Sequence, residues 1–350
     1  MRIEAFGALR ERLAWLRFAW HRSYARANRA QLERVVRDRL ERPPDRYPRG
    51  LVSIGLTHRC QYRCAYCATD GYRKDGRGEL GTAEVVRLLD DVARSRHVFH
   101  HVSFLGGECL LRRDLDELVR AATERGLLLH LSTNGLALDE ARIARLVAAG
   151  LNSVFVAWEL GAPGHAQAAR RRAAVERAVR ACARQALPCF LSVCVRRENV
   201  WNGDVEAALA AGRALGAAGV RLFSVRPSGA WLQKGDDALL DAPERARLRS
   251  LCRSGYAWLT DDAEKAAGRT CAAFARRIVY VSPYGELQPC HFFPFGFGDV
   301  RAGGLDAALD RMWSHPMLLD RYPDCALEHR DFRAEHVAPL ASGARLPLMV

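Results

Sequence analysis

Apolar residues along positions 51–225 alternate between two spacings, and this alternation predicts a repeating strand–helix chain. Six short runs rich in Val, Ile, Leu and Phe predict strands at 51–57, 100–105, 127–132, 152–158, 189–195 and 220–225. Between them, apolar residues at three- and four-residue steps predict helices over 83–95, 113–125, 139–149, 164–186 and 203–217. Because such repeats favour a parallel sheet with right-handed crossovers, we expect an α/β fold, either a barrel or a doubly wound sheet.

The two ends of the chain carry different patterns. Apolar residues on one face of 3–20, and a second periodic run at 31–40, predict two N-terminal helices that either pack across the main domain or bind a membrane surface or a peptide. The segment Arg226-Pro227-Ser228-Gly229 ends the alternation. Beyond it we expect a helix over 243–258, a hairpin turning at Tyr284-Gly285 and a helix over 305–313. These breaks divide the chain into an extension at 1–50, a core at 51–229 and a smaller domain at 230–350.

Composition narrows the class of protein. With 350 residues and 49% hydrophobic content, the chain can bury a full core, but no apolar run approaches the roughly 20 residues of a membrane span. The 11 cysteines lack a secretory signal before them, so we expect metal or redox chemistry in the cytoplasm rather than disulfides. Of the net charge of +13, residues 1–50 hold +7, with 13 arginines against six acidic residues.

Three cysteines directly follow the first predicted strand. Cys60, Cys64 and Cys67 have the spacing C-x3-C-x2-C, and Tyr66 precedes the last of them. Three thiolates within eight residues can ligate three irons of a [4Fe–4S] cluster and leave the fourth iron open. A zinc site would need a fourth ligand, for which His58 is the nearest candidate, and usually two C-x2-C pairs. The spacing therefore favours the cluster.

This motif resembles that of the radical S-adenosylmethionine (SAM) enzymes, with Tyr66 in the aromatic position. The resemblance implies a partial (β/α)6 barrel resembling the TIM fold, with the cysteine loop at the carboxyl ends of the strands. It implies that the open iron chelates SAM, and that an electron from the cluster cleaves SAM to a 5′-deoxyadenosyl radical that abstracts hydrogen. It also implies oxygen sensitivity and a flavodoxin- or ferredoxin-like electron donor.

The ends of the next two predicted strands carry residues suited to SAM. Paired glycines let a backbone approach a ligand closely, and a neighbouring carboxylate can accept hydrogen bonds from an ammonium group. The resemblance assigns Gly106, Gly107 and Glu108 to SAM's amino group, although such a triplet can also form a plain turn. At the end of 127–132, Ser132 and Asn134 are candidate contacts to SAM, although the same sequence can simply terminate a strand.

The fourth and fifth predicted strands offer the candidate catalytic residues. Relatives commonly have Ser-(apolar)-Asp where this chain has Ala157 and Trp158 followed by Glu159, so contact by a hydroxyl at 157 is lost. Glu159 either replaces the acid and faces the active site or is a solvated loop carboxylate, and Trp158 either lines the substrate space or fills the barrel. Cys194 is a candidate hydrogen-atom donor, although a buried free cysteine is usually a small apolar residue.

A second cysteine pattern follows residue 230. Cys271, 13 residues, Gly285, four residues and Cys290 resemble the start of the accessory SPASM and twitch domains, and Cys325 comes later. A full SPASM domain has a further run of close cysteines, so the resemblance implies the shorter twitch type with one auxiliary [4Fe–4S] cluster. Its fourth ligand would be Cys252, a histidine such as His291 or His329, or the substrate. The alternative is three structural cysteines without metal.

Taken together, the motifs predict a radical SAM oxidoreductase that oxidises or crosslinks a peptide or a small molecule in natural-product or cofactor biosynthesis. No winged-helix domain for leader-peptide binding fits in residues 1–50, so a peptide substrate would need a separate recruiting partner or the basic extension. RNA modification is an alternative that the basic charge permits, but the excess charge is confined to one end. A non-catalytic Fe–S electron carrier or scaffold is a second alternative.

Overall fold

A computed structural model gives the fold and describes residues 50–97, 99–161, 164, 166–252, 255–260, 271–319, 322, 324–340 and 345–350. The two helices predicted within 3–20 and 31–40 lie outside the described residues. No helix in the described part is both long and apolar enough to cross a membrane.

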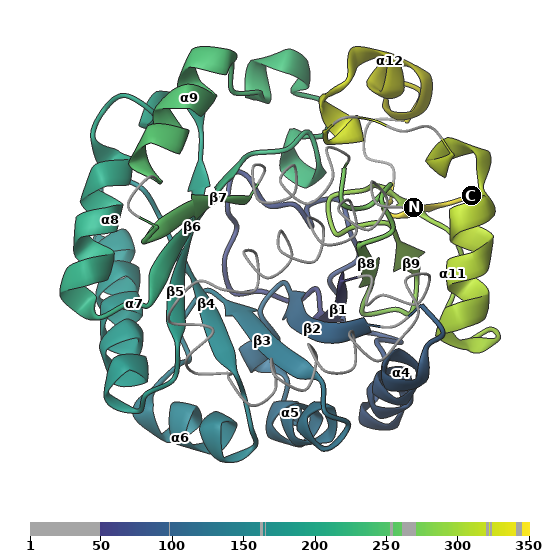
Figure 1. The fold of residues 1–350 in the computed structure, drawn as a ribbon, viewed down its shortest axis with the longest axis horizontal. Helices are drawn as coiled ribbons and strands as arrows, with labels where there is room; N and C mark the ends of the chain where they lie inside the picture. The colour runs from purple at the N-terminus through teal and green to yellow at the C-terminus, as the bar shows by residue number, and fades with distance from the viewer. Residues whose placement is uncertain are drawn as a thin grey trace, which may run out of the picture.

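Nine strands of the described chain form one sheet in the order β7-β6-β5-β4-β3-β2-β1-β8-β9, parallel except for the pair β8–β9. The strands are β1 (Gly50–Thr57), β2 (Phe99–Gly106), β3 (Leu128–Thr133), β4 (Ser153–Trp158), β5 (Cys189–Val195), β6 (Gly219–Ser224), β7 (Ala257–Leu259), β8 (Ile278–Val281) and β9 (Leu287–Gln288). From β1 to β7 the strands are adjacent in chain order, without the reversal that a doubly wound sheet has. The arc in Figure 1 is therefore a partial barrel, which confirms the predicted fold class.

Helices between the strands cover the outer side of this arc (Figure 1). They are α4 (Thr82–Arg94), α5 (Leu115–Glu124), α6 (Glu140–Ala148), α7 (Ala166–Arg184), α8 (Asp204–Leu215) and α9 (Ala242–Leu251). In α4 the buried apolar stripe is Val85, Leu88, Leu89 and Val92, at the three- and four-residue steps of one helix face. The six predicted strands and the five predicted core helices are confirmed to within a few residues.

The helix predicted over 243–258 is wrong in its second half. α9 ends at Leu251, and Ala257–Leu259 forms β7, which pairs in parallel with β6. The chain reverses at Gly255, whose φ of +70° is a left-handed conformation that glycine adopts without strain. Three apolar residues were too few to distinguish a strand from the end of a helix.

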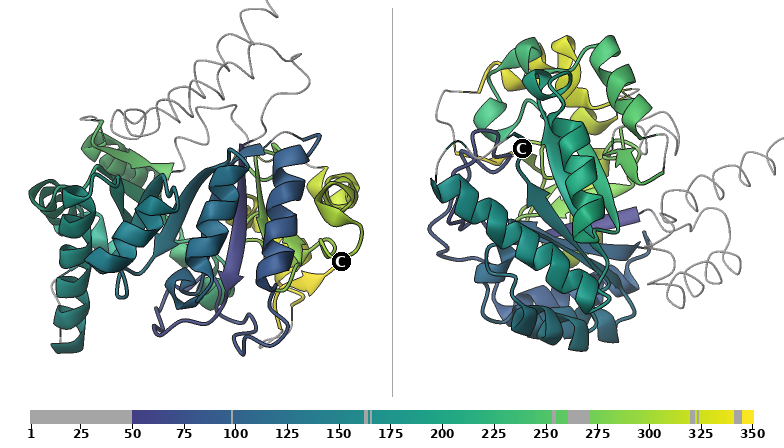
Figure 2. Two further views of the ribbon diagram at one scale, coloured as in Figure 1. Left: turned by 90° about the horizontal axis from the view of Figure 1, so that it is seen from below. Right: turned by 90° about the vertical axis from the view of Figure 1, so that its left-hand side faces the viewer.

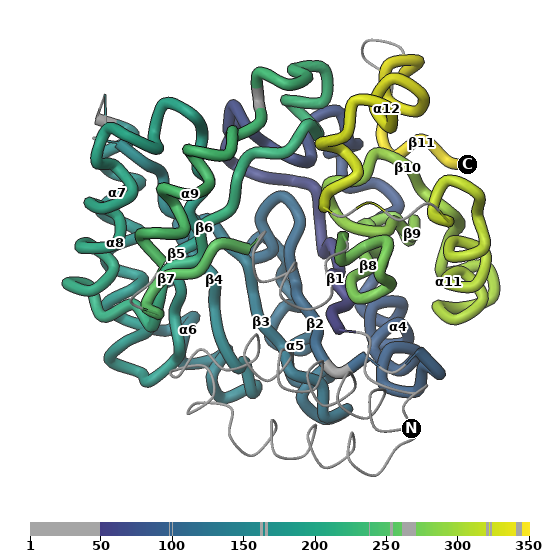
Figure 3. The backbone as a smooth tube through the Cα atoms, turned by 45° about the horizontal axis from the view of Figure 1, so that its top comes forward, coloured from purple at the N-terminus to yellow at the C-terminus, as the bar shows by residue number. Residues whose placement is uncertain are grey.

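The C-terminal part continues the barrel sheet. β8 pairs in parallel with β1, on the side away from β2, and turns back at Ser282–Glu286 into β9, which confirms the predicted hairpin. Figure 3 shows these strands beside β1, with α11 (Gly304–Ser314) outside them, close to the predicted 305–313. The helix α12 (Arg330–Phe332) follows α11, and β10 (Phe295–Gly296), which precedes α11, pairs in parallel with β11 (Leu348–Met349) near the end of the chain. The boundary at 229/230 stays a prediction.

Candidate functional site

The three cysteines of the motif lie on the loop that follows β1, at the carboxyl edge of the sheet (Figure 2, left). The loop turns tightly, since Cys67 N donates to Cys64 O over 3.2 Å and Tyr62 N donates to Cys60 Sγ over 3.3 Å. All three thiols are half-buried. Burial, followed by the neighbouring thiols, raises the pKa of Cys64 to about 11, and burial also raises the pKa of Cys60. The Cys60 and Cys64 thiols therefore stay protonated at neutral pH unless a cation such as iron binds them.

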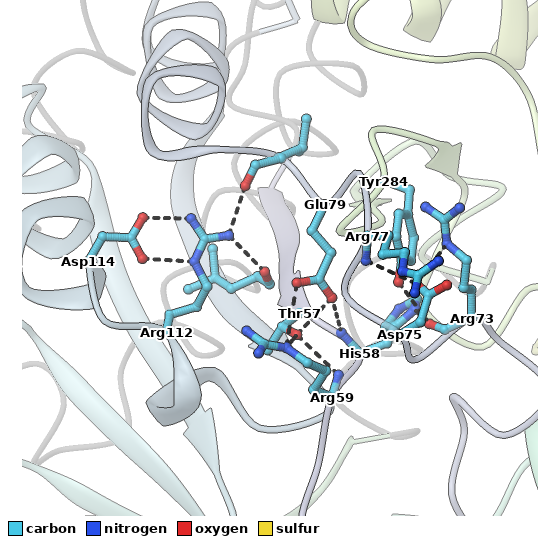
Figure 4. A network of polar contacts seen from close by, with 12 residues as sticks. Thr57, His58, Arg59, Arg73, Asp75, Arg77, Glu79, Arg112, Asp114 and Tyr284 are labelled. Carbon is cyan, nitrogen blue, oxygen red and sulfur yellow. Dashed lines mark hydrogen bonds and ion pairs between the residues drawn. The ribbon is translucent and has the colours of Figure 1, made fainter.

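Glu79 ties the two ends of the cysteine loop together (Figure 4). Its Oε1 accepts hydrogen bonds from Thr57 Oγ1 over 2.7 Å and from His58 N over 3.1 Å, and its side chain is 7% exposed. Arg59 approaches the second carboxylate oxygen at 3.9 Å. The loop is thus closed at its base by a side chain that no sequence motif singled out.

Arg112 provides a second tie below the loop (Figure 4). Its Nη1 donates to Leu56 O over 3.0 Å and to Leu80 O over 2.8 Å, which joins the end of β1 to the segment before α4. Two further hydrogen bonds, of 2.8 and 2.6 Å, reach Asp114. Burial alone would raise the pKa of Asp114, but hydrogen bonds from Arg112 and Thr82 outweigh it and hold the pKa at about 2.

His58 is not available as a zinc ligand. Nδ1 lies 3.2 Å from Arg73 O and Nε2 lies 3.0 Å from Tyr280 Oη, so both ring nitrogens already have partners. Burial lowers the pKa of His58 to about 4, which keeps the ring neutral. Because Tyr280 belongs to β8, this contact joins the cysteine loop to the C-terminal hairpin.

The Gly-Gly-Glu triplet packs directly beneath the cysteine loop. A side chain at Gly106 would place a Cβ 2.1 Å from Thr57 O, and one at Gly107 would place it 2.4 Å from Arg59 O. Backbone hydrogen bonds accompany this approach, from Gly107 N to Thr57 O and from Glu108 N to Arg59 O. The glycines thus permit a close contact between two backbone segments, beside whatever ligand the loop holds.

Glu108 joins this triplet to the end of β3. Its fully buried carboxylate accepts hydrogen bonds from Thr133 Oγ1 over 2.7 Å, Asn134 N over 2.7 Å and Leu110 N over 3.0 Å. Burial raises its pKa, and these donors oppose that effect. Nearby, Asn134 Nδ2 is buried, and the Asn134 side chain interacts with the Cys60 thiol, which partly opposes the rise in the pKa of that thiol.

The candidates on β3, β4 and β5 differ in where they point. Ser132 is partly exposed, on the same strand face as His130, and Cys194 is 8% exposed, with a pKa that burial raises to about 12. Cys194 also interacts electrostatically with Cys64 and Tyr66, which places it beside the cysteine loop. Burial is the main reason that the pKa of Tyr66 is raised.

Trp158 faces away from the barrel interior. It is 4% exposed, belongs to the apolar core and lies 4.0 Å beneath the Arg172 guanidinium of α7. It therefore fills the layer between sheet and helices. Glu159 is exposed. The pKa values of Tyr62 and Cys64 are raised mainly by the burial of those two side chains, and the Glu159 carboxylate contributes a smaller part of the rise. Glu159 thus borders the loop from the solvent side.

The segment 229–231, after β6, binds the backbone of the cysteine loop; we call these contacts the clasp. The sequence did not predict them. Ala230 N donates to Cys67 O over 3.0 Å, and Trp231 Nε1 donates to Ala65 O over 2.8 Å. Gly229 has a φ of +52°, and a Cβ there would lie 2.2 Å from Cys67 O. Only a residue without a side chain allows this approach.

Aromatic packing draws together the three segments that carry the accessory cysteines. Phe274, three residues after Cys271, forms edge-on ring contacts with Phe293, Tyr322 and Phe332, with centroids 6.0, 5.5 and 6.3 Å apart. Phe293 is three residues after Cys290, and Tyr322 and Phe332 flank Cys325. Of the candidate fourth ligands, His329 Nε2 already contacts Asp324 Oδ1, whereas His291 Nδ1 is buried without a hydrogen bond to the described residues.

Comparison with known proteins identifies the family. A profile described as the Radical SAM superfamily matches residues 54–210. A PqqA peptide cyclase from Granulibacter bethesdensis is 31% identical over 266 residues, covering 70% of this chain and 68% of that protein. Another, from Gluconobacter oxydans, is 33% identical over 254 residues, covering 67% and 68%. The chain belongs to the radical SAM superfamily.

A solved structure has the same fold. Streptococcus suis SuiB bound to precursor peptide SuiA matches with a TM-score of 0.59 and 13% identity, over 77% of this radical SAM chain and 66% of that chain. At this identity the likeness concerns the fold alone. The chain thus spans about two thirds of the length of the known proteins it matches here.

The residues of the loop suit the cluster and SAM that membership of the superfamily implies. In the described part of the chain, no three His, Cys, Asp or Glu side chains converge as the ligands of a single metal ion do. A cube of four irons and four sulfides holds its thiolates farther apart, and three half-buried thiols on one loop supply that number of ligands. The buried Asn134 amide lies beside Cys60, one of these three thiols.

Proposed function

We propose that this radical SAM enzyme abstracts hydrogen from a peptide and thereby oxidises or crosslinks it. The observation that carries the proposal is the cysteine loop at the carboxyl edge of a partial barrel, in a chain 31–33% identical to proteins named PqqA peptide cyclase. The structure with the same fold, SuiB, was solved with a precursor peptide. A cytoplasmic enzyme with a flavodoxin- or ferredoxin-like donor completes the proposal.

The chain's own residues have distinct roles in this proposal. Cys60, Cys64 and Cys67 hold the cluster, which supplies, when bound with SAM, the reductive cleavage to a 5′-deoxyadenosyl radical. Tyr66, Gly106, Gly107, Glu108, Ser132 and Asn134 surround SAM. Glu108 fixes the end of β3 through the hydrogen bond that it accepts from Asn134 N. Cys194 keeps its thiol hydrogen, because burial raises its pKa to about 12, and can donate that hydrogen to a product radical. Glu159 lies at the border between the loop and solvent.

The C-terminal part has a separate role. We assign Cys271, Cys290 and Cys325 to an auxiliary [4Fe–4S] cluster in an accessory domain of residues 230–350, next to the barrel core of 51–229 and the extension of 1–50. The aromatic contacts among Phe274, Phe293 and Phe332 support this assignment, because they join the three cysteine segments. An auxiliary cluster would accept an electron from the substrate.

The test uses the anaerobically reconstituted enzyme with SAM and titanium(III) citrate, a chemical reductant that needs no donor protein. We expect 5′-deoxyadenosine by chromatography. Addition of the peptide encoded beside the gene should increase its yield and give a peptide product lighter by two hydrogen atoms. SAM binding without any 5′-deoxyadenosine would instead indicate a non-catalytic Fe–S protein. Modification of an RNA, with binding that weakens steeply with salt, would overturn the peptide substrate.

A further inference from the structure

The partly exposed positions of the strands mark which side chains face the interior of the barrel. Strand side chains alternate between the two faces, and the outer face is sealed by helices. In β5, β6 and β7 the partly exposed residues are Ser192, Arg221, Phe223 and Trp258, among otherwise buried neighbours. Ser192, Arg221 and Trp258 are direct cross-strand partners, and Ser192 is paired with the exposed Ala157 of β4. These residues form one row across the inner wall.

Arg221 is the positively charged residue of this row, and the side chains that it contacts are uncharged. Its Nη2 and Nε donate to Ser192 Oγ over 2.7 and 3.3 Å, and its Cζ lies 4.3 Å from the centre of the Phe155 ring. Among the described residues it makes no ion pair with a carboxylate, whereas arginines near the loop, such as Arg112, do. Burial lowers the pKa of Arg221 to about 10, but the group stays charged at neutral pH.

The described residues around Arg221 add no negative charge. Burial, followed by the Arg221 charge, lowers the pKa of His130 to about 3, so that this ring is neutral. His291 Nδ1 is buried and receives no hydrogen bond from the described part of the chain. A charged group enclosed by a protein costs free energy unless it is paired, and a guanidinium presents a fork of donors that matches a carboxylate. Ser192 uses only part of that fork.

We propose that Arg221 binds a carboxylate of the substrate inside the barrel: an Asp or Glu side chain of the peptide, or its C-terminal carboxylate. The proposal rests on the proposed function for its substrate class. Arg221 lies on β6, the strand next to the one that carries Cys194. Cys194 is paired across the sheet with Phe223, two residues after Arg221. The bound carboxylate would thus hold the peptide below the cysteine loop, with Phe155 and Trp258 as apolar walls.

The test measures anion preference without turnover. Two matched probes, N-acetyl-glutamate N-methylamide and its glutamine counterpart, are bound by equilibrium dialysis to the SAM-saturated enzyme in the absence of reductant. Because a charge-assisted pair is worth more than a neutral hydrogen bond, we expect the glutamate probe to bind at least about tenfold more tightly. Arg221→Met should remove the preference, and Arg221→Lys should keep part of it. Saturating SAM occupies the cationic groups of its own site.

Arg172→Met is the control, because Arg172 also covers an aromatic ring but lies on the outer side of the sheet; it should leave the preference intact. Equal binding of the two probes by the wild-type enzyme, or a preference that survives in Arg221→Met, would overturn the proposal. A roughly tenfold loss of SAM affinity in Arg221→Met would overturn it as well, by making Arg221 a ligand of SAM. Failure of the proposed function would give a different result, namely the absence of 5′-deoxyadenosine.

Discussion

Cys60, Cys64 and Cys67 lie within eight residues of one loop, whereas Cys271, Cys290 and Cys325 come from three segments that packing brings together. The loop keeps its shape through ties to its own base, from Glu79 and Gly107, and through the clasp at Gly229. The C-terminal cysteines depend instead on a shared aromatic cluster. The proposed auxiliary site should therefore be more sensitive to distant packing than the loop is.

The largest expected effect separates the two regions outright. Replacing Cys60, Cys64 and Cys67 together by Ala should abolish SAM cleavage, because the proposed cluster loses all its protein ligands. About four irons per chain should remain after anaerobic reconstitution, the content of one auxiliary [4Fe–4S] unit. Iron, sulfide and 5′-deoxyadenosine are measured on the same sample. Near-zero iron would show that the C-terminal cysteines are structural, and surviving SAM cleavage would refute the assignment of the loop.

A core truncation tests the distributed site. Phe332 is fully buried in the aromatic cluster, and Phe332→Ala should lower the free energy of unfolding by roughly 3–5 kcal/mol. In the background without the loop cysteines, it should also reduce the remaining iron. Phe99→Ala is the matched control, since Phe99 is 1% exposed but belongs to β2. It should cost similar stability, measured by urea unfolding, and leave that iron unchanged. Equal iron loss in both variants would argue against a specific role of the aromatic cluster.

The clasp on the loop gives a smaller effect. Gly229→Ala places a Cβ against Cys67 O. Gly235→Ala is its control, because Gly235 also has a positive φ, of +61°, but a Cβ added there would meet no atom of the described residues within 4 Å. Backbone strain should cost each variant about 1–2 kcal/mol of stability, and Gly229→Ala should lose more, because the backbone at Cys67 must also shift. Only Gly229→Ala should also slow SAM cleavage, by about tenfold, because it moves a cluster ligand. Identical rates in the two variants would remove the clasp from the mechanism.

The sequence predicted the features that depend on a local pattern of residues. It missed those that depend on contacts between segments far apart in the chain. The strands, the core helices and the C-x3-C-x2-C loop follow from periodicity and spacing over short stretches. β7 was missed because three apolar residues beyond Gly255 carry little periodic signal. Glu79 and Arg112 bind atoms of distant segments, so no spacing identifies them. Arg221 had a signal, a lone charge within the apolar strand GVRLFS, but its lack of an acidic partner among the described residues required the fold.

His58 connects the two regions, since it precedes the loop cysteines and contacts Tyr280 of β8. Its pKa is about 4 in the folded chain and near 6.5 when unfolded, so between these values the unfolded chain binds more protons. The contribution of His58 to the free energy of unfolding is therefore fully present above pH 6.5 and is lost as the pH drops toward 4. His58→Gln should reduce this slope by up to about 1.4 kcal/mol per pH unit in anaerobic urea unfolding.

His130→Gln separates the titration of a buried histidine from the link between the two regions. Burial lowers the pKa of His130 to about 3, so its replacement should flatten the pH dependence of stability between pH 6.5 and 4 by a similar amount. His130 lies on β3 and contacts Phe155 rather than the hairpin. SAM cleavage at pH 7.5, a neutral reference at which both histidines are uncharged, should therefore fall in His58→Gln and persist in His130→Gln. An unchanged slope in both variants would contradict the burial argument, whereas equal cleavage rates would show that the cysteine loop works independently of the hairpin.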